Sequence, residues 1–197
     1  MIKTKKDLRD YLAADALAHG IKSHNYKDMI FHSFFDRIWI FHKCLRRVEY
    51  YKNNNRNIFI EFCYQIQRYK LNRISIKLGF SIPANVCGKG LAVPHYGSIV
   101  INTNARIGKN CMIHSCVNIG ANGGSSKAPQ IGNNVFIGPG AKIYGDISIA
   151  DNVYIGANAV VNKSIPERNA VVAGVPAKII KYEKILWWEK NRLNLEY

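Results

Sequence analysis

Aliphatic residues recur every six positions through the second half of this 197-residue chain. One series comprises Ile131, Ile137, Ile143, Ile149, Ile155 and Val161. A second series follows each of these by four residues and comprises Val135, Ala141, Ile147, Val153, Ala159 and Ile165. A period of six fits neither a helical stripe, which repeats at 3.6, nor a strand, which alternates at 2. It predicts the hexapeptide repeats of a parallel β-helix, in which three short strands and their turns close one coil.

The same period extends towards the N-terminus through Ile119, Ile113, Ile107 and Ile101. Because Ile119 and Ile131 are twelve residues apart, residues 120–130 can leave the coil and return in phase. Their sequence is rich in Gly and Ser and contains a Pro, which is typical of a projecting loop. One further step back from Ile101 reaches His95, so a titratable ring is expected at an inward position.

The formal net charge of +15 indicates a surface that attracts anionic partners, such as nucleic acid, lipid headgroups or an acidic small molecule. We find no N-terminal apolar run after the charged start and no run of eighteen apolar residues. The sequence therefore predicts a cytoplasmic protein without a signal peptide or membrane span.

The five cysteines fit reduced thiols in that compartment, because an odd number cannot all be paired within one chain. Cys87 and Cys111 fall on the second inward series, where Cys acts as a small apolar residue. A nucleophilic role would need an electropositive, partly exposed setting. No CxxC pair or His cluster with zinc spacing is present, so no metal is expected.

Residues 1–78 are predicted to form an α-helical N-terminal domain. The segment Asp7–Asp15 follows Thr4, a helix-capping residue type, and Gly20 is placed to end the helix. Two further helices are predicted, over Asp28–Tyr51 and Ile58–Leu78. Aromatic residues at helical spacing usually pack against other elements, so we favour a packing role over nucleic-acid binding.

The β-helix is expected over residues 79–172, and residues 173–197 are expected to form a separate C-terminal segment. The hexad period breaks at residues 173–179, and Lys181–Tyr197 has the composition of a short helix containing Trp187 and Trp188. We expect this helix to lie on a partner subunit. Peripheral association with a membrane is the alternative, because Trp and Lys suit both surfaces.

The run from Gly79 to Ile180 resembles the left-handed β-helix acyltransferases, and among them the serine O-acetyltransferase type. The matching segments are the motif from His95 to Val100, the loop position after Gly120, and the closing Gly-x-Pro-Ala-Lys from Gly174 to Lys178. The resemblance implies left-handed winding and acetyl-CoA as the acyl donor. We also expect a homotrimer with three equivalent sites, because a flat-faced coil exposes much aliphatic and backbone surface that a ring of identical subunits would cover.

The catalytic His of that family maps onto His95. An alcohol must lose its proton as it attacks a thioester, and an imidazole titrates near the working pH and can accept that proton. His114 is the alternative base, because it also lies beside an inward position, just before the loop. A structural His at an irregular coil is a further possibility for His95.

Three positions depart from the serine enzymes. The acid that orients the catalytic His falls at Phe80, the Asp before that His is Pro94, and the loop His that holds the amino-acid substrate falls at Ala128. The chain resembles more closely the serine-acetyltransferase-like proteins of capsule and exopolysaccharide biosynthesis, so we expect a sugar or polysaccharide-precursor hydroxyl as the acceptor. Two alternatives stay open: a true serine O-acetyltransferase and a non-catalytic scaffold that binds a polyanion.

Coenzyme A combines a thin pantetheine arm with phosphates, so a groove between coils of two neighbouring subunits would suit it. By resemblance to hexapeptide sugar acetyltransferases, the donor-binding residues are Pro139 and Ala157 along the arm, Asn162 and Lys163 further along, and Lys178 and Lys181 at the phosphates. Each lysine has the alternative interpretation of an ordinary solvated charge.

Overall fold

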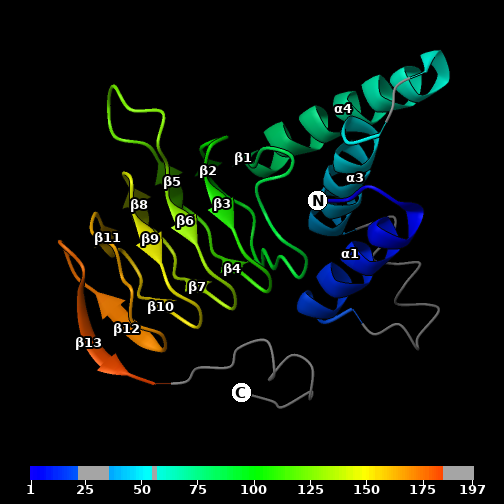
Figure 1. Ribbon diagram of the computed structural model, residues 1–197. Helices are drawn as coiled ribbons and strands as arrows, with labels where there is room; N and C mark the ends of the chain where they lie inside the picture. Colours follow the sequence, from blue (N-terminus) through cyan, green and yellow to red (C-terminus); the bar gives the residue numbers. More distant parts are fainter. Residues whose placement is uncertain (22–35, 55–56, 184–197) are drawn as a thin grey trace.

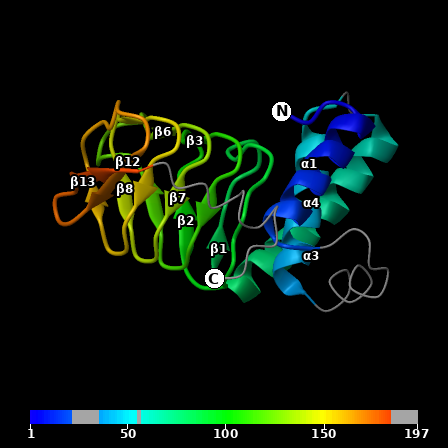
Figure 2. The same cartoon turned by 90° about the horizontal axis from the view of Figure 1, so that it is seen from below.

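In the part of the chain that the structure describes, the helices lie at one end of a stack of short strands (Figures 1 and 2). The structure is a computed structural model that describes residues 1–21, 36–54 and 57–183. The helices are α1 (Lys5–Ala18), α3 (Arg37–Lys52) and α4 (Ile58–Leu78). The strands begin directly after α4, so the chain passes from helices to coils without a linker.

The strands form three sheets, one for each face of the coil, and their pairing is parallel except for one antiparallel pair at the C-terminal end. Through most of the coil, successive strands along the chain belong to the three faces in turn. The first sheet contains β1 (Phe80–Ser81), β2 (Ile99–Ile101), β5 (Asn118–Gly120), β8 (Lys142–Tyr144) and β11 (Val160–Val161). The second contains β3 (Arg106–Ile107), β6 (Gln130–Ile131) and β9 (Ser148–Ile149). The third contains β4 (Met112–Ile113), β7 (Phe136–Ile137), β10 (Tyr154–Ile155), β12 (Ala170–Ala173) and β13 (Lys178–Tyr182). This arrangement confirms the predicted parallel β-helix.

Both predicted aliphatic series point into the coil. Ile113, Ile137 and Ile155 are completely buried, as are Val135 and Ala141 of the second series. Because both series contribute to one continuous cluster, the core is a column of stacked aliphatic side chains. Residues 122–127, between β5 and β6, are exposed and project from the coil (Figure 1), whereas Ala128 is already back in the core, so the excursion is shorter than the predicted residues 120–130.

The predicted inward position of His95 is wrong. Ala92 pairs with Met112, twenty residues later, whereas Val100 pairs with Asn118, eighteen residues later. The turn between Ala92 and Val100 therefore contains two more residues than the same turn of the next coil. These extra residues shift the phase, so that His95 is exposed on the outside of the turn.

A ladder of asparagines stabilises the turns between the second and third sheets. Asn110 donates to Asn134, Asn134 to Asn152, and Asn152 to Asn169, at 2.9 to 3.1 Å between Nδ2 and Oδ1. All four residues have φ between 53° and 62°, a left-handed conformation that asparagine tolerates better than most residues. The ladder joins four successive coils on the outside of the stack.

The predicted helix ends agree well with the structure. Thr4 caps α1 in a capping box with Asp7, and Gly20 adopts φ 72° just beyond the helix. The bounds of α4 are those predicted from the sequence. For the helix predicted over Asp28–Tyr51, the described part is α3, and the rest of that prediction lies outside the described residues.

The C-terminal segment differs from its prediction where it is described. Residues Lys178–Tyr182 form strand β13, which pairs antiparallel with β12. Lys181 therefore lies in a strand and does not begin a helix, because the sheet edge at β12 offers hydrogen-bond partners to an extended chain. Trp187 and Trp188 lie outside the described residues.

A buried arginine fixes the helices to the first coil. Arg46 of α3 is completely buried, and its guanidinium donates to Asp15 of α1 at 2.7 Å (Nε to Oδ2) and to Glu49 at 2.9 Å (Nη1 to Oε2). It also donates to the carbonyl oxygens of Cys87 and Gly88, at 2.9 and 2.7 Å. We refer to Asp15, Arg46 and Glu49 as the Arg46 clamp.

Asp15 completes the connection by accepting hydrogen bonds from the N–H groups of Gly90 and Leu91, at 2.8 and 3.0 Å. Burial raises the pKa of its carboxyl, but Arg46 and His42 lower that pKa by more, so the net pKa falls to about 2. The Asp15 carboxylate is thus ionised inside the protein, where it accepts hydrogen bonds from Arg46 and from the N–H groups of Gly90 and Leu91. It holds the strand-like segment that leads into the turn of His95.

Candidate active site

The turns that follow the third sheet form one row along the β-helix. They comprise residues 94–98, 114–117, 138–141 and 156–159, and we call this row the His95 corner. The N–H of Gly140 donates to the carbonyl of Ser115 at 2.9 Å, and the N–H of Asn158 donates to that of Pro139 at 2.8 Å. Main-chain hydrogen bonds therefore keep successive turns in register, with His95 on the first turn.

Two histidines meet at this corner. The rings of His95 and His114 lie 5.9 Å apart between centroids, at an interplanar angle of 49°. His114 also lies 5.0 Å from the ring of Phe136, which stacks on Tyr154 at 4.2 Å. The predicted base and its alternative thus belong to one cluster, although only His95 is exposed.

The environment of His114 favours its neutral form. Burial lowers its pKa from 6.5, and the nearby His95 lowers it further. Its Nε2 atom is buried and has no hydrogen-bond partner among the described residues. The lowered pKa makes His114 a weaker base, and its half-buried ring is less accessible to an incoming hydroxyl than the exposed ring of His95. The geometry therefore favours His95 as the base.

No carboxylate orients His95 within residues 1–21, 36–54 and 57–183, and its side chain makes no hydrogen bond there. Phe80 is buried in the core and packs edge to face against Phe41 of α3, with ring centroids 5.0 Å apart. Ala128 is also buried and belongs to the same core. At these two positions, where the sequence differs from the serine enzymes, the side chains therefore pack in the core.

A pocket of about 430 Å³ lies beside the residue that follows His95. It is lined by Tyr96 and by residues at the facing ends of α3 and α4, among them the cations Arg37 and Lys77 and one carboxylate, that of Asp36. Tyr96 is 72% exposed, and both cations are exposed as well. Reasoning from the sequence did not identify this pocket, because it joins residues about sixty positions apart. Its cations are suited to a carboxylate or a phosphate.

The structure brings some of the predicted donor-binding residues together and separates others. Pro139 and Ala157 lie on adjacent turns of the His95 corner, one coil apart as predicted, and both are exposed. Lys178 pairs with Ala173 at the far end of this corner. Asn162 and Lys163 instead follow β11, on the next corner of the coil.

Lys181 pairs with Val171 on β13, and its ammonium forms an ion pair with Glu183. That ion pair competes with a phosphate for the same charge, so Lys181 is the less favourable of the two lysines. Lys178 remains exposed at the end of the row that contains His95.

The buried cysteines are poor nucleophiles. Burial raises the pKa of the Cys87 thiol to about 12, and burial raises that of Cys111 as well. Both therefore act as apolar core residues, as their positions in the repeat predicted. In the described parts of the chain, no group of three or more His, Cys, Asp or Glu side chains is placed to hold a metal ion.

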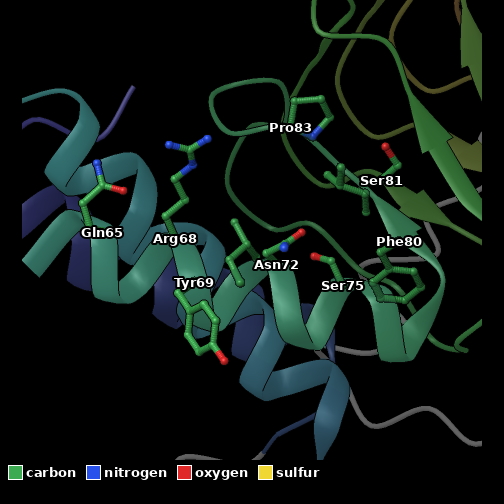
Figure 3. Close-up of a pocket in the computed structure, with 10 residues that line it drawn as sticks. Gln65, Arg68, Tyr69, Asn72, Ser75, Phe80, Ser81 and Pro83 are labelled. Atoms are coloured by element: carbon green, nitrogen blue, oxygen red, sulfur yellow. The ribbon is translucent and has the colours of Figure 1, made fainter.

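A second groove, of about 500 Å³, lies between α4 and the start of the β-helix (Figure 3). Arg68, Asn72 and Ser75 of α4 face Ser81 and Pro83 across it. Apart from Phe80, none of the residues considered above lines this groove. It is therefore distinct from the His95 corner.

Residues 128–163 match the family model described as bacterial transferase hexapeptide (six repeats). The chain is 38% identical over 122 residues to the serine acetyltransferase of Buchnera aphidicola, a match that covers 60% of this chain and 46% of that protein. Across the first curated relatives, the chain spans about half of their length.

Solved structures give the same result over a larger part of the chain. The serine acetyltransferase of Brucella abortus superposes with a TM-score of 0.69 at 27% identity, covering 91% of this chain and 71% of that one. The soybean serine acetyltransferase complexed with serine also gives a TM-score of 0.69, at 26% identity, covering 88% and 69%. The similarity therefore includes the helices as well as the hexapeptide coils.

Proposed function

We propose that this protein is an acetyl-CoA-dependent O-acetyltransferase in which His95 is the general base. The observation that carries this proposal is the His95 corner, where an exposed imidazole begins a straight row of turns that ends near an exposed lysine. The similarity to serine acetyltransferases supports the same chemistry.

The reaction needs two proton transfers, one from the acceptor hydroxyl to His95 and one from His95 to the leaving thiolate. His95 accepts the proton of the acceptor hydroxyl as its oxygen attacks the thioester carbonyl, which gives a tetrahedral oxyanion. Collapse of that intermediate forms the ester and expels the thiolate of coenzyme A, which takes the proton back from the imidazolium. A main-chain N–H of the corner is suited to stabilise the oxyanion, because it needs no reorganisation during the reaction.

The donor is proposed to lie along the His95 corner, with its pantetheine arm against Pro139 and Ala157 and its phosphates at Lys178. Asn162 and Lys163 lie on another corner, so they reach the same donor only if a neighbouring subunit contributes them. A trimer of parallel β-helices provides that arrangement, because each groove then lies between corners of two copies. We therefore propose a homotrimer with one donor site at each interface.

For the acceptor we propose serine in the first place. The relatives and solved structures named above are serine acetyltransferases, and they favour serine over the sugar that the departures from the family led us to expect. The pocket beside Tyr96 supports this choice, because its two cations, Arg37 and Lys77, outnumber the carboxylate of Asp36 and can attract the carboxylate of an amino acid.

A sugar or polysaccharide-precursor hydroxyl is the second candidate. Phe80 and Ala128 are buried apolar residues at positions where the serine enzymes are expected to use polar groups, and Pro94 cannot supply a carboxylate. These substitutions favour the subgroup of capsule and exopolysaccharide acetyltransferases. An acceptor held mainly by hydroxyl groups would not require the missing charges.

The test is an acetyl-transfer assay that follows release of the coenzyme A thiol, with serine and a panel of nucleotide sugars and oligosaccharides as acceptors. His95→Asn should lower kcat by about 10² to 10⁴ while leaving acetyl-CoA affinity nearly unchanged. Acetyl-CoA should also raise the melting temperature, since a ligand at a hundred times its Kd stabilises by roughly 2.7 kcal/mol. Absence of both transfer and thermal stabilisation would favour the non-catalytic polyanion-binding scaffold.

A further inference from the structure

One side of helix α4 exposes a row of large apolar side chains, which we call the outer face of α4. Its members and their exposed fractions are Ile58 (92%), Phe59 (69%), Phe62 (64%), Ile66 (36%), Tyr69 (65%) and Ile76 (72%). They recur at spacings of three and four residues, with one gap at Arg73, so they share one stripe of the helix. Leu71, Ile74 and Leu78 lie on the opposite side and pack into the core.

The charges of α4 lie around this stripe and are almost all positive. Of its five charged residues, only Glu61 is acidic. At roughly 100° per residue, Lys70 and Lys77 fall along one edge of the outer face, and Arg73 falls within it. All three of these cations are exposed. The helix therefore combines an apolar stripe with a border of cations.

Arg68 adds a cation on the other edge, where the groove of Figure 3 begins. The figure shows its guanidinium directed from α4 into the space below the loop that contains Pro83. Asn72, Ser75 and Ser81 line the same groove and supply hydrogen-bonding groups. A volume of about 500 Å³ beside the outer face is large enough for a phosphate-bearing headgroup.

We propose that α4 docks this protein on an anionic lipid surface, with the outer face among the acyl chains and the flanking cations at the phosphates. Aromatic and aliphatic side chains on one face and Lys or Arg beside them are the features of helices that lie in a membrane interface. None of the helices in the described ranges is long and apolar enough to cross a membrane, so α4 would lie on the surface.

Charge complementarity favours a lipid surface over a second copy of the chain as the occupant. Two copies of α4 placed face to face would bring eight cations together with only two acidic residues. An anionic bilayer neutralises those cations, and the long side chain of Arg73 can extend from the apolar stripe towards the headgroups. The net charge of +15 likewise attracts the chain as a whole to an anionic surface.

The experiment is sedimentation of the full chain with vesicles of phosphatidylcholine, alone or mixed with phosphatidylglycerol. We expect binding to the mixed vesicles only, weakened by salt. Each basic residue near an anionic leaflet is worth roughly a fivefold change in partitioning, so Lys70→Gln/Arg73→Gln/Lys77→Gln should weaken binding on the order of a hundredfold. Phe59→Ser/Phe62→Ser should weaken it by about tenfold or more.

The matched control is Lys5→Gln/Lys6→Gln/Lys109→Gln, which removes the same charge from exposed positions outside α4. An equal loss of binding in this control would overturn the proposal, because the attraction would then be a property of the net charge. Light scattering provides the second control. If Phe59→Ser/Phe62→Ser dissociates an assembly and leaves vesicle binding unchanged, the outer face is a contact between copies and the proposal is wrong.

Discussion

The Arg46 clamp should dominate the stability of the junction between the helices and the β-helix. Asp15→Asn keeps the size of the side chain but leaves the buried guanidinium of Arg46 with Glu49 as its remaining carboxylate. Removing one partner of a buried ion pair costs about 3 to 5 kcal/mol. For a chain of this size that loss lowers Tm by roughly 10 °C and the urea midpoint by roughly 1 to 2 M.

The assay is urea unfolding followed by the helical circular dichroism signal, with Asp10→Asn as the control. Asp10 is an exposed residue of the same helix, so its substitution should change the free energy of unfolding by less than about 0.5 kcal/mol. Adding Arg46→Met to Asp15→Asn should cost less than the sum of the two single changes, because both remove the same contact. A cost for Asp15→Asn equal to that of Asp10→Asn, with additive behaviour in the double variant, would refute this reasoning.

Further predictions concern acid stability, the corner and the donor. The pKa of Asp15 is lowered from 3.8 to about 2, so the stability that its carboxylate contributes should be present above about pH 4 and lost as the pH falls towards 2. Asp15→Asn should abolish this acid-unfolding step. The lowered pKa of His114 means that the folded chain resists protonation, so stability should fall as the pH drops below about 6.5, and His114→Asn should remove that part of the decline. Gly138→Ala should destabilise the fold measurably in thermal unfolding, because a Cβ there would lie 2.8 Å from the main-chain nitrogen of Ala157, whereas Gly123→Ala, which meets open space, should not. In steady-state kinetics, Lys178→Ala should raise KM for acetyl-CoA by about tenfold or more and leave acetyl-pantetheine nearly unaffected, since only acetyl-CoA carries the 3′-phosphate; an equal effect on both donors would show that Lys178 does not meet the phosphates.

The repeat made most of the β-helix predictable. Inward positions are specified by a six-residue period, and Ile137 or Ala141 can be assigned without knowing the rest of the fold. The period fails where the chain inserts extra residues into a turn. His95 was expected to point inward because the phase was counted back through Ile101, and the two additional residues of its turn place it outside.

The Arg46 clamp and the pocket beside Tyr96 could not be predicted in the same way. Both depend on contacts between residues far apart in sequence, such as Arg46 and Cys87, and no local pattern encodes such contacts. The antiparallel strand that contains Lys181 was missed for a similar reason. Its composition suits a helix, but the edge of β12 provides hydrogen-bond partners that only the folded β-helix presents.

The number of coils along the His95 corner also sets the distance between the base and Lys178. Neighbouring strands of a sheet lie about 4.8 Å apart, so the four coil steps from the turn of His95 to the turn of Gly174, with one further spacing from β12 to β13, separate the base from Lys178 by roughly 24 Å along the stack. Inserting or deleting one coil of eighteen residues would change this separation by a single strand spacing and leave the residues at both ends untouched. The number of coils thus acts as a molecular ruler for the acyl donor, and a chain with one coil more or fewer should prefer a carrier arm of different length.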